Sequence, residues 1–133
     1  MQQTRDPKHF AEQLRARTRQ FALGVILLCR RFPRTVDGYV LAKQLIRAAT
    51  STAANYRACC RSRSASDFVS KMSVVCEEAD ESEFWLELAI AASLSMESDA
   101  EARDLLAEAS ELVALFTKSR ETAKRNIRQR AGL

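Results

Sequence analysis

Carboxylate side chains with a regular spacing are the residues of this chain that could support catalysis. Glu77, Glu78 and Glu81 form the pattern E-E-x-x-E, and Glu101 with Asp104 forms E-x-x-D. Carboxylate oxygens are ligands that Mg²⁺ prefers, and a bound Mg²⁺ can hold the phosphates of a nucleotide between helices. The spacing is therefore compatible with metal-dependent hydrolysis of a nucleoside triphosphate.

The carboxylate pattern is similar to that of all-α nucleotide pyrophosphatases, but it also has a simpler explanation. Helices rich in glutamate produce such spacings by chance, and Glu101 can instead cap a helix together with Ser98. No Gly-rich phosphate loop and no Ser/His/Asp or Cys/His set supports another catalytic chemistry. A Mg-dependent nucleotide pyrophosphatase stays open as an alternative, and a non-enzymatic function is the stronger hypothesis.

The cysteines and the single histidine do not have the spacing of a metal site. Cys29, Cys59, Cys60 and Cys76 include no C-x-x-C pair, and His9 lies far from them in the sequence. In a reducing compartment such thiols act mainly as small apolar side chains. We expect no metal centre and no cofactor.

Positive charge is concentrated in the first half of the chain. Residues 1–65 contain thirteen basic and three acidic residues, a formal charge of +10, whereas residues 66–133 contain eight and fourteen, a charge of −6. Arginine binds phosphate groups, so the first half is the candidate surface for a nucleic acid. The candidate contacts are Arg15, Arg17, Arg19, Arg30, Arg31, Arg34, Arg57, Arg61 and Arg63.

The apolar pattern predicts four long helices that would position these side chains. Apolar residues recur every three or four positions over about residues 7–32, 37–63, 66–96 and 98–128. Asp6 before Pro7, Asp37, and the segment from Ser64 to Asp67 are suited to cap the first three helices. We expect one all-α domain over residues 1–133, an antiparallel up-down-up-down four-helix bundle.

Antiparallel packing of the second and third helices predicts a polar layer between them. Arg47 would face Glu78 and Glu81, and Ser51 and Asn55 would lie beside the same carboxylates. The alanines around them let the two backbones approach. We expect these five residues to have a structural role.

Phe84, Trp85 and Leu88 lie largely outside the apolar series of the third helix. Such a second apolar stripe indicates a surface for self-association. The alternative is that Trp85 fills a wide core. We expect Phe84, Trp85 and Leu88 to form an interface between copies of the chain.

No segment indicates export or membrane insertion. The N-terminal MQQTRDPKHF lacks the apolar core of a secretory signal, and the longest apolar run, Phe21–Cys29, is too short to span a bilayer. We expect a cytoplasmic protein with no membrane partner.

The segment FPRTVDGYVLAKQLIRAATSTAANYRACCRSRSASDFVSKM, with the later EEADESEFWLEL, resembles the four-helix-bundle family of proteins encoded in intervening sequences of 23S rRNA genes. The resemblance covers roughly residues 10–120. Its motif includes Phe32-Pro33, Leu41 and Gln44, Arg47-Ala48-Ala49, Ser51, Asn55, Glu78 and Glu81. Many relatives have Asn-Ile-Ala-Glu-Gly where this chain has Asn-Tyr-Arg-Ala-Cys from Asn55 to Cys59, so it resembles an Asn-Tyr-Arg-Ala subgroup.

The resemblance implies a bundle that assembles as a ring of five subunits. Certain relatives are basic accessory proteins to the reverse transcriptase of diversity-generating retroelements and contact RNA. Together with the charge pattern, this favours a non-enzymatic homo-oligomer that binds structured RNA, with a reverse transcriptase as a candidate partner. An assembly scaffold with no nucleic-acid role is the alternative.

Overall fold

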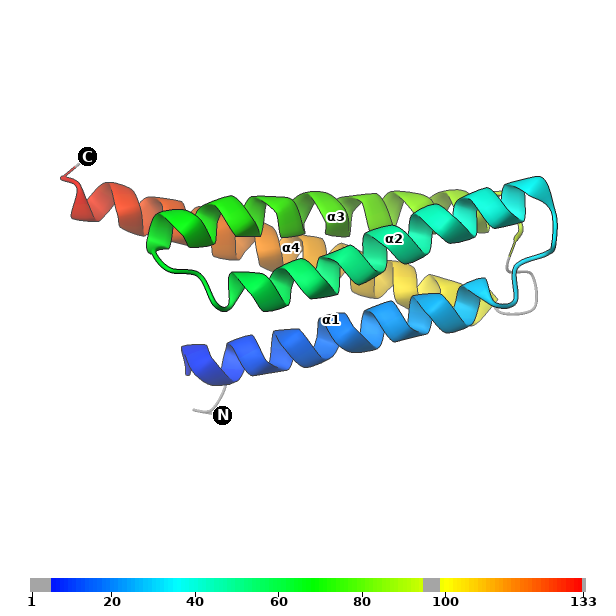
Figure 1. The fold of residues 1–133 in the computed structure, drawn as a ribbon, viewed down its shortest axis with the longest axis horizontal. Coiled ribbons are helices and arrows are strands. Elements are labelled where there is room, and N and C mark those ends of the chain that lie inside the picture. Colours follow the sequence, from blue (N-terminus) through cyan, green and yellow to red (C-terminus); the bar gives the residue numbers. More distant parts are fainter. Residues whose placement is uncertain (1–5, 95–98, 133) are drawn as a thin grey trace.

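The computed structural model describes residues 6–94 and 99–132 as four α-helices in an antiparallel bundle (Figure 1). They are α1 (Pro7–Cys29), α2 (Val36–Cys59), α3 (Ala65–Ala91) and α4 (Asp99–Arg130). These residues include no β-strand, and each helix packs along the next one in the chain, which confirms the all-α bundle. In the same two ranges, no helix combines the length and the apolarity needed to cross a membrane.

Side-chain caps begin the first and third helices where the sequence predicts. Asp6 accepts a hydrogen bond from the Lys8 N–H at 3.1 Å, and Pro7 occupies the first turn of α1. At the start of α3, the Asp67 N–H donates to the Ser64 hydroxyl at 3.0 Å, and the Asp67 carboxylate accepts from the Arg63 N–H at 3.0 Å. That reciprocal pair of bonds fixes the turn between α2 and α3.

The start of α2 differs from the prediction, because Thr35 rather than Asp37 is the cap. The Thr35 hydroxyl accepts a hydrogen bond from the Gly38 N–H at 3.2 Å. Asp37 lies in the first turn, where its negative charge interacts favourably with the helix N-terminus. Its pKa is lowered first by a hydrogen bond with Thr35 and then by backbone N–H groups.

The first three helices end earlier than the apolar pattern suggests, and α4 ends two residues later. After Cys29, the Arg31 and Phe32 N–H groups donate to carbonyls three residues back, so the chain tightens into a turn. After α3, Ser93 adopts a left-handed conformation with φ of 59°. The predicted cap at Ser98 falls outside the described residues.

The predicted apolar series form the core. In the first predicted helix, the apolar series over residues 7–32 is buried at all six positions: Leu14, Thr18, Phe21, Val25, Leu28 and, just after α1, Phe32. Across the bundle, the rings of Tyr56 and Phe116 pack with their centroids 5.2 Å apart. The buried hydroxyls of Thr52 and Ser82 donate to carbonyls one turn back, at 2.8 and 2.9 Å, so neither lacks a partner.

Three of the four thiols lie in this core, as the sequence predicts. Cys29, Cys59 and Cys76 are buried, and Cys60 is half-buried. Burial raises the pKa of Cys29 to about 12 and that of Cys59 to about 11. These thiols therefore stay protonated near neutral pH and act as small apolar side chains.

Candidate nucleic-acid interface

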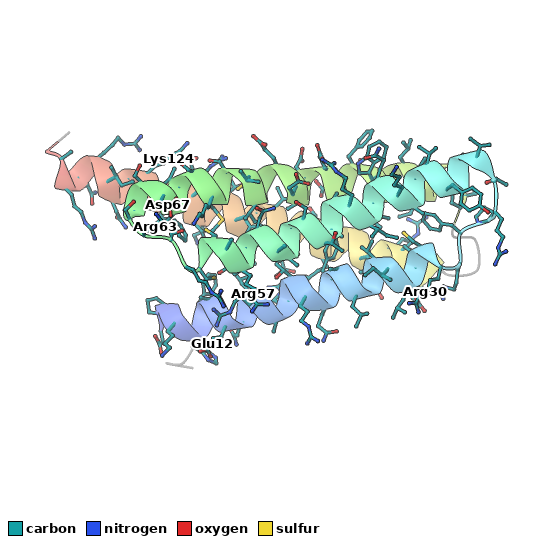
Figure 2. All side chains as sticks on the ribbon, viewed as in Figure 1. Glu12, Arg30, Arg57, Arg63, Asp67 and Lys124 are labelled. Atoms are coloured by element: carbon teal, nitrogen blue, oxygen red, sulfur yellow. The ribbon has the colours of Figure 1, made fainter. Side chains whose placement is uncertain are left out.

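An open groove of about 720 Å³ runs between α1 and α2. Four arginines line it, with small side chains between them. Figure 2 shows Arg57 on the side of α2 that faces α1. The lining residues are Arg15, Ala16, Arg19 and Ala22 from α1, Thr50, Ala53, Ala54 and Arg57 from α2, and Arg61 from the turn after α2.

Helical periodicity and the turn after α2 together bring four arginines to the groove. Arg15 and Arg19 are four residues apart on α1, so they lie on one helix face. Arg57 lies in the last turn of α2, and Arg61 lies in the turn that follows Cys59. Antiparallel packing of α1 on α2 brings the two pairs to the same stretch of the bundle. The alanines between them leave the groove open and its charged walls accessible.

These four arginines have no carboxylate partner among the residues that the structure describes. All four side chains are exposed to solvent. Glu12, near the N-terminus of α1, is an acidic neighbour on the same helix, but it does not line the groove. The groove therefore has uncompensated positive charge on both walls.

Arg17 and Arg31, which were candidates from the sequence, instead pair with carboxylates of α4. The Arg17 guanidinium donates to both carboxylate oxygens of Glu108, at 2.6 and 3.1 Å, and lies 3.2 Å from Glu111. The hydrogen bond with Glu108 is the main cause of a raised Arg17 pKa. Arg31 forms a hydrogen-bonded ion pair with Glu101. These pairs join α1 and the turn after it to α4, and α1 packs less extensively against α4 than against α2.

Arg30, Arg34 and Arg63 are exposed but do not line the groove. Arg30 follows the C-terminal end of α1, far along the bundle from Arg57 (Figure 2). Arg63 lies in the turn before α3, where its backbone N–H donates a hydrogen bond to the Asp67 carboxylate. The structure thus gathers four of the nine candidate arginines into one site.

A second hollow of about 520 Å³ adjoins the groove, and Arg15 lines both. Sequence reasoning missed its other polar residues, because only the packing of α1 against the α2–α3 turn brings them together. The hollow is lined by Lys8, Ala11, Arg15, Tyr56, Cys59, Cys60, Ser62, Ser64 and Phe68.

The predicted polar layer between α2 and α3 forms only in part. Arg47 lies 3.9 Å from Glu81, as expected. The Asn55 amide donates to the carbonyl and hydroxyl oxygens of Ser51, at 2.8 and 2.9 Å, and not to a carboxylate. One carboxylate oxygen of Glu78 is buried without a hydrogen-bond partner. Burial is the main cause of a raised Glu78 pKa, and the negative charge of Glu81 adds to it.

An apolar patch lies on the outer face of α2 and α3. Phe84 is 52% exposed and Leu88 40% exposed, whereas Trp85 is half-buried against the core, with its ring 4.9 Å from that of Phe84. Since Arg47 meets Glu81, two turns further along each helix Val40 comes beside Leu88, and Val40 is 49% exposed. With Val36, also exposed, these residues form what we call the outer patch: Val36, Val40, Phe84 and Leu88.

The carboxylates of the E-E-x-x-E and E-x-x-D patterns do not converge. Within residues 6–94 and 99–132, no three His, Cys, Asp or Glu side chains are grouped so that they could hold a metal ion. Glu101 pairs with Arg31 instead of facing the glutamates of α3. The arrangement gives the pyrophosphatase hypothesis no structural support.

The chain is similar to known proteins in sequence and in fold. The model of a family described as 23S rRNA-intervening sequence protein matches residues 13–118, a range that includes the four groove arginines. A crystal structure of a protein of unknown function from the S23 ribosomal protein family of Bacteroides thetaiotaomicron has a TM-score of 0.73 to this chain at 24% identity, covering 84% of this chain and 97% of that one. This likeness establishes a shared fold. No curated protein matches the sequence.

Proposed function

Because the chain belongs to the 23S rRNA-intervening sequence protein family, we propose that it is a non-enzymatic protein that binds structured RNA. The contact is the groove between α1 and α2, through Arg15, Arg19, Arg57 and Arg61. The observation that carries the proposal is that these four cations share one open groove without carboxylate partners among the described residues. Phosphate groups of RNA supply the missing charge, so binding depends on shape and not on base sequence.

A salt series tests RNA binding directly. Four phosphate contacts predict that log K falls against log salt with a slope of about −3 to −4. The double variant R57E/R61E should keep its helicity and lose most of its affinity for RNA. Its matched control is K118E/R128E, which has the same net charge and changes two exposed residues of α4 outside the groove. A flat salt response, or equal losses in both variants, would refute the proposal.

We further propose that the protein works as a cytoplasmic homo-oligomer, with the outer patch and the adjoining Trp85 as the contact between subunits. The outer patch supports this because it leaves four large or branched apolar side chains exposed on the neighbouring helices α2 and α3. The resemblance noted in the sequence implies five subunits and a reverse transcriptase as a candidate partner. Light scattering measures the subunit number, and co-purification with the enzyme tests the partner.

The apolar face also favours a second candidate function, an assembly scaffold with no nucleic-acid role. A scaffold would form the oligomer but show no salt-dependent RNA affinity. The two measurements above therefore separate the candidates.

A further inference from the structure

We propose that the part of the structured RNA held in the groove is an unpaired segment, laid lengthwise between α1 and α2 with its phosphates between the two pairs of arginines. This inference rests on the proposed function, since it names the form of nucleic acid that the same site accepts.

The positive charges line both sides of the groove between α1 and α2. Arg15 and Arg19 are about 6 Å apart along α1, and Arg57 and Arg61 line the opposite side. The axes of packed helices are about 8–10 Å apart, so the two pairs of arginines can contact the backbone of one strand from both sides. A double helix is much wider and could touch only the rim. Proteins that bind single strands use a positive groove of this kind to follow the backbone.

The groove is long enough for several nucleotides. Arg15 also lines the second hollow, where Lys8 adds a fifth cation. From Ala22 to Lys8 the site spans roughly 21 Å along α1. A compact anion such as inorganic tripolyphosphate would use only part of this length, so the site fits an extended polyanion better.

The small side chains that line the groove provide few hydrogen-bonding groups that could distinguish one base from another. Ala16, Ala53 and Ala54 have no polar side-chain atoms, and the Thr50 hydroxyl already donates to the Ile46 carbonyl at 2.7 Å. In the second hollow, Phe68 is half-buried and presents the edge or face of a ring to the space that Arg15 borders. A base can stack on such a ring whatever its identity, which makes the binding tolerant of sequence.

The experiment compares an unpaired oligouridine of about 12 nucleotides, a length within the range of known single-strand sites, with an RNA duplex of equal length, by fluorescence anisotropy on the full chain. The single strand should bind at least tenfold more tightly than the duplex. R57E/R61E should lose at least tenfold for the single strand, whereas K118E/R128E should not. Phe68→Leu, which keeps an apolar side chain at this position, should weaken the single strand about fivefold by removing one stacking contact.

The outcomes separate this inference from the proposed function. If the duplex binds as tightly as the single strand and R57E/R61E weakens both, RNA binding stands and the unpaired strand is refuted. If tripolyphosphate displaces the strand at equal phosphate concentration, the site takes a compact anion and the inference is again refuted. If neither RNA binds, or R57E/R61E changes neither affinity, the proposed function fails and the inference fails with it.

Discussion

Arg17 and Arg19 lie two residues apart on α1, yet their surroundings differ completely. Arg17 points toward α4 and forms two hydrogen bonds with Glu108. Arg19 lines the groove on the α2 side and has no carboxylate partner among the described residues. Successive helix positions turn by about 100°, so the two side chains point in different directions. Arg17 therefore stabilises the packing of α1 on α4, whereas Arg19 remains available to a ligand.

The variants Arg17→Ala and Arg19→Ala should therefore have opposite effects. Arg17→Ala loses a partly exposed but bidentate ion pair, so the free energy of unfolding should fall by about 0.5–1 kcal/mol with RNA affinity nearly unchanged. Arg19→Ala should leave stability unchanged and reduce the salt slope of RNA binding by about 1. Urea unfolding and the salt series measure both quantities. Since the two variants have the same net charge, each is the control for the other, and equal effects on RNA would contradict the assignment.

From the sequence we could predict which arginines lie on or next to a helix, but not which of them pair with a carboxylate. The partner of Arg17 lies 91 residues away, on a helix whose rotation about its axis no local pattern determines. The pair of Arg47 and Glu81 was predictable because a short turn fixes the register of α2 against α3. Long-range pairs across α1 and α4 had no such constraint.

Glu78 is the one described side chain with a buried polar atom that lacks a hydrogen-bond partner. Its pKa is raised, mainly by burial and then by Glu81, while Arg47 opposes the shift. A raised pKa means that the folded chain keeps this proton at pH values where the unfolded chain, with a glutamate pKa near 4.3, has lost it. Stability should therefore fall as pH rises from about 4.3 through the raised pKa.

Removing the charge with Glu78→Gln should abolish this loss. The variant should be more stable than the wild type near neutral pH by up to about 1 kcal/mol, and the difference should shrink in acid, where Glu78 is protonated in both states. Thermal unfolding across a pH series measures it. Glu87→Gln, an exposed change of the same charge on α3, is the control. A stability difference that does not vary with pH would mean that the Glu78 charge is satisfied in the folded chain.

At the scale of helices, Gly38 in the first turn of α2 allows the backbone of the α1–α2 turn to pack closely against it. A Cβ atom at Gly38 would lie 2.1 Å from the carbonyl oxygen of Pro33, which belongs to the backbone and cannot easily move. At Gly24, in the middle of α1, the nearest atom to an added Cβ is the end of the Leu105 side chain at 2.9 Å, which can rotate away. The two glycines therefore have different structural roles.

Gly38→Ala should destabilise the protein by about 2–3 kcal/mol, because the turn between α1 and α2 must open to remove the overlap. Gly24→Ala is the matched change, and it should lie within about 1 kcal/mol of the wild type, because higher helix propensity offsets the movement of Leu105. Chemical denaturation monitored by circular dichroism measures both. Equal destabilisation would show that the turn adapts as easily as the Leu105 side chain.

Helix existence and the buried faces were predictable from apolar periodicity, and the helix ends were less so. The caps at Asp6 and Ser64 follow from local side-chain chemistry. The cap of α2 could not be predicted in this way, because Thr35 and Asp37 are both good capping residues. Thr35 is the cap because the chain packs closely between Pro33 and Gly38, and local sequence does not reveal that packing. The outer patch was likewise half predicted: Phe84 and Leu88 depart from the α3 series, whereas Val36 and Val40 join them only through the packing of α2 on α3.

For the whole molecule, the opposite charges of the two halves are partly neutralised within the subunit. Arg17 and Arg31 pair with carboxylates of α4, and Arg47 pairs with Glu81 of α3, so three of the thirteen basic residues in the first half are neutralised within the subunit. The groove arginines remain exposed between α1 and α2, while the outer patch involves residues of α2 and α3. Binding and assembly therefore use different residues and should be separable by mutation.

The double variant F84E/L88E tests this separation. Two charges in the outer patch should block association by desolvation and mutual repulsion, so light scattering should report a lower subunit number than for the wild type. Helicity should be retained, because both side chains are already about half exposed. Each subunit should keep its groove and hence the same salt slope for a short RNA, while long RNAs that bridge several subunits should bind more weakly as avidity is lost. An unchanged subunit number would remove the outer patch as the interface, and a changed salt slope on short RNA would mean that the groove depends on assembly.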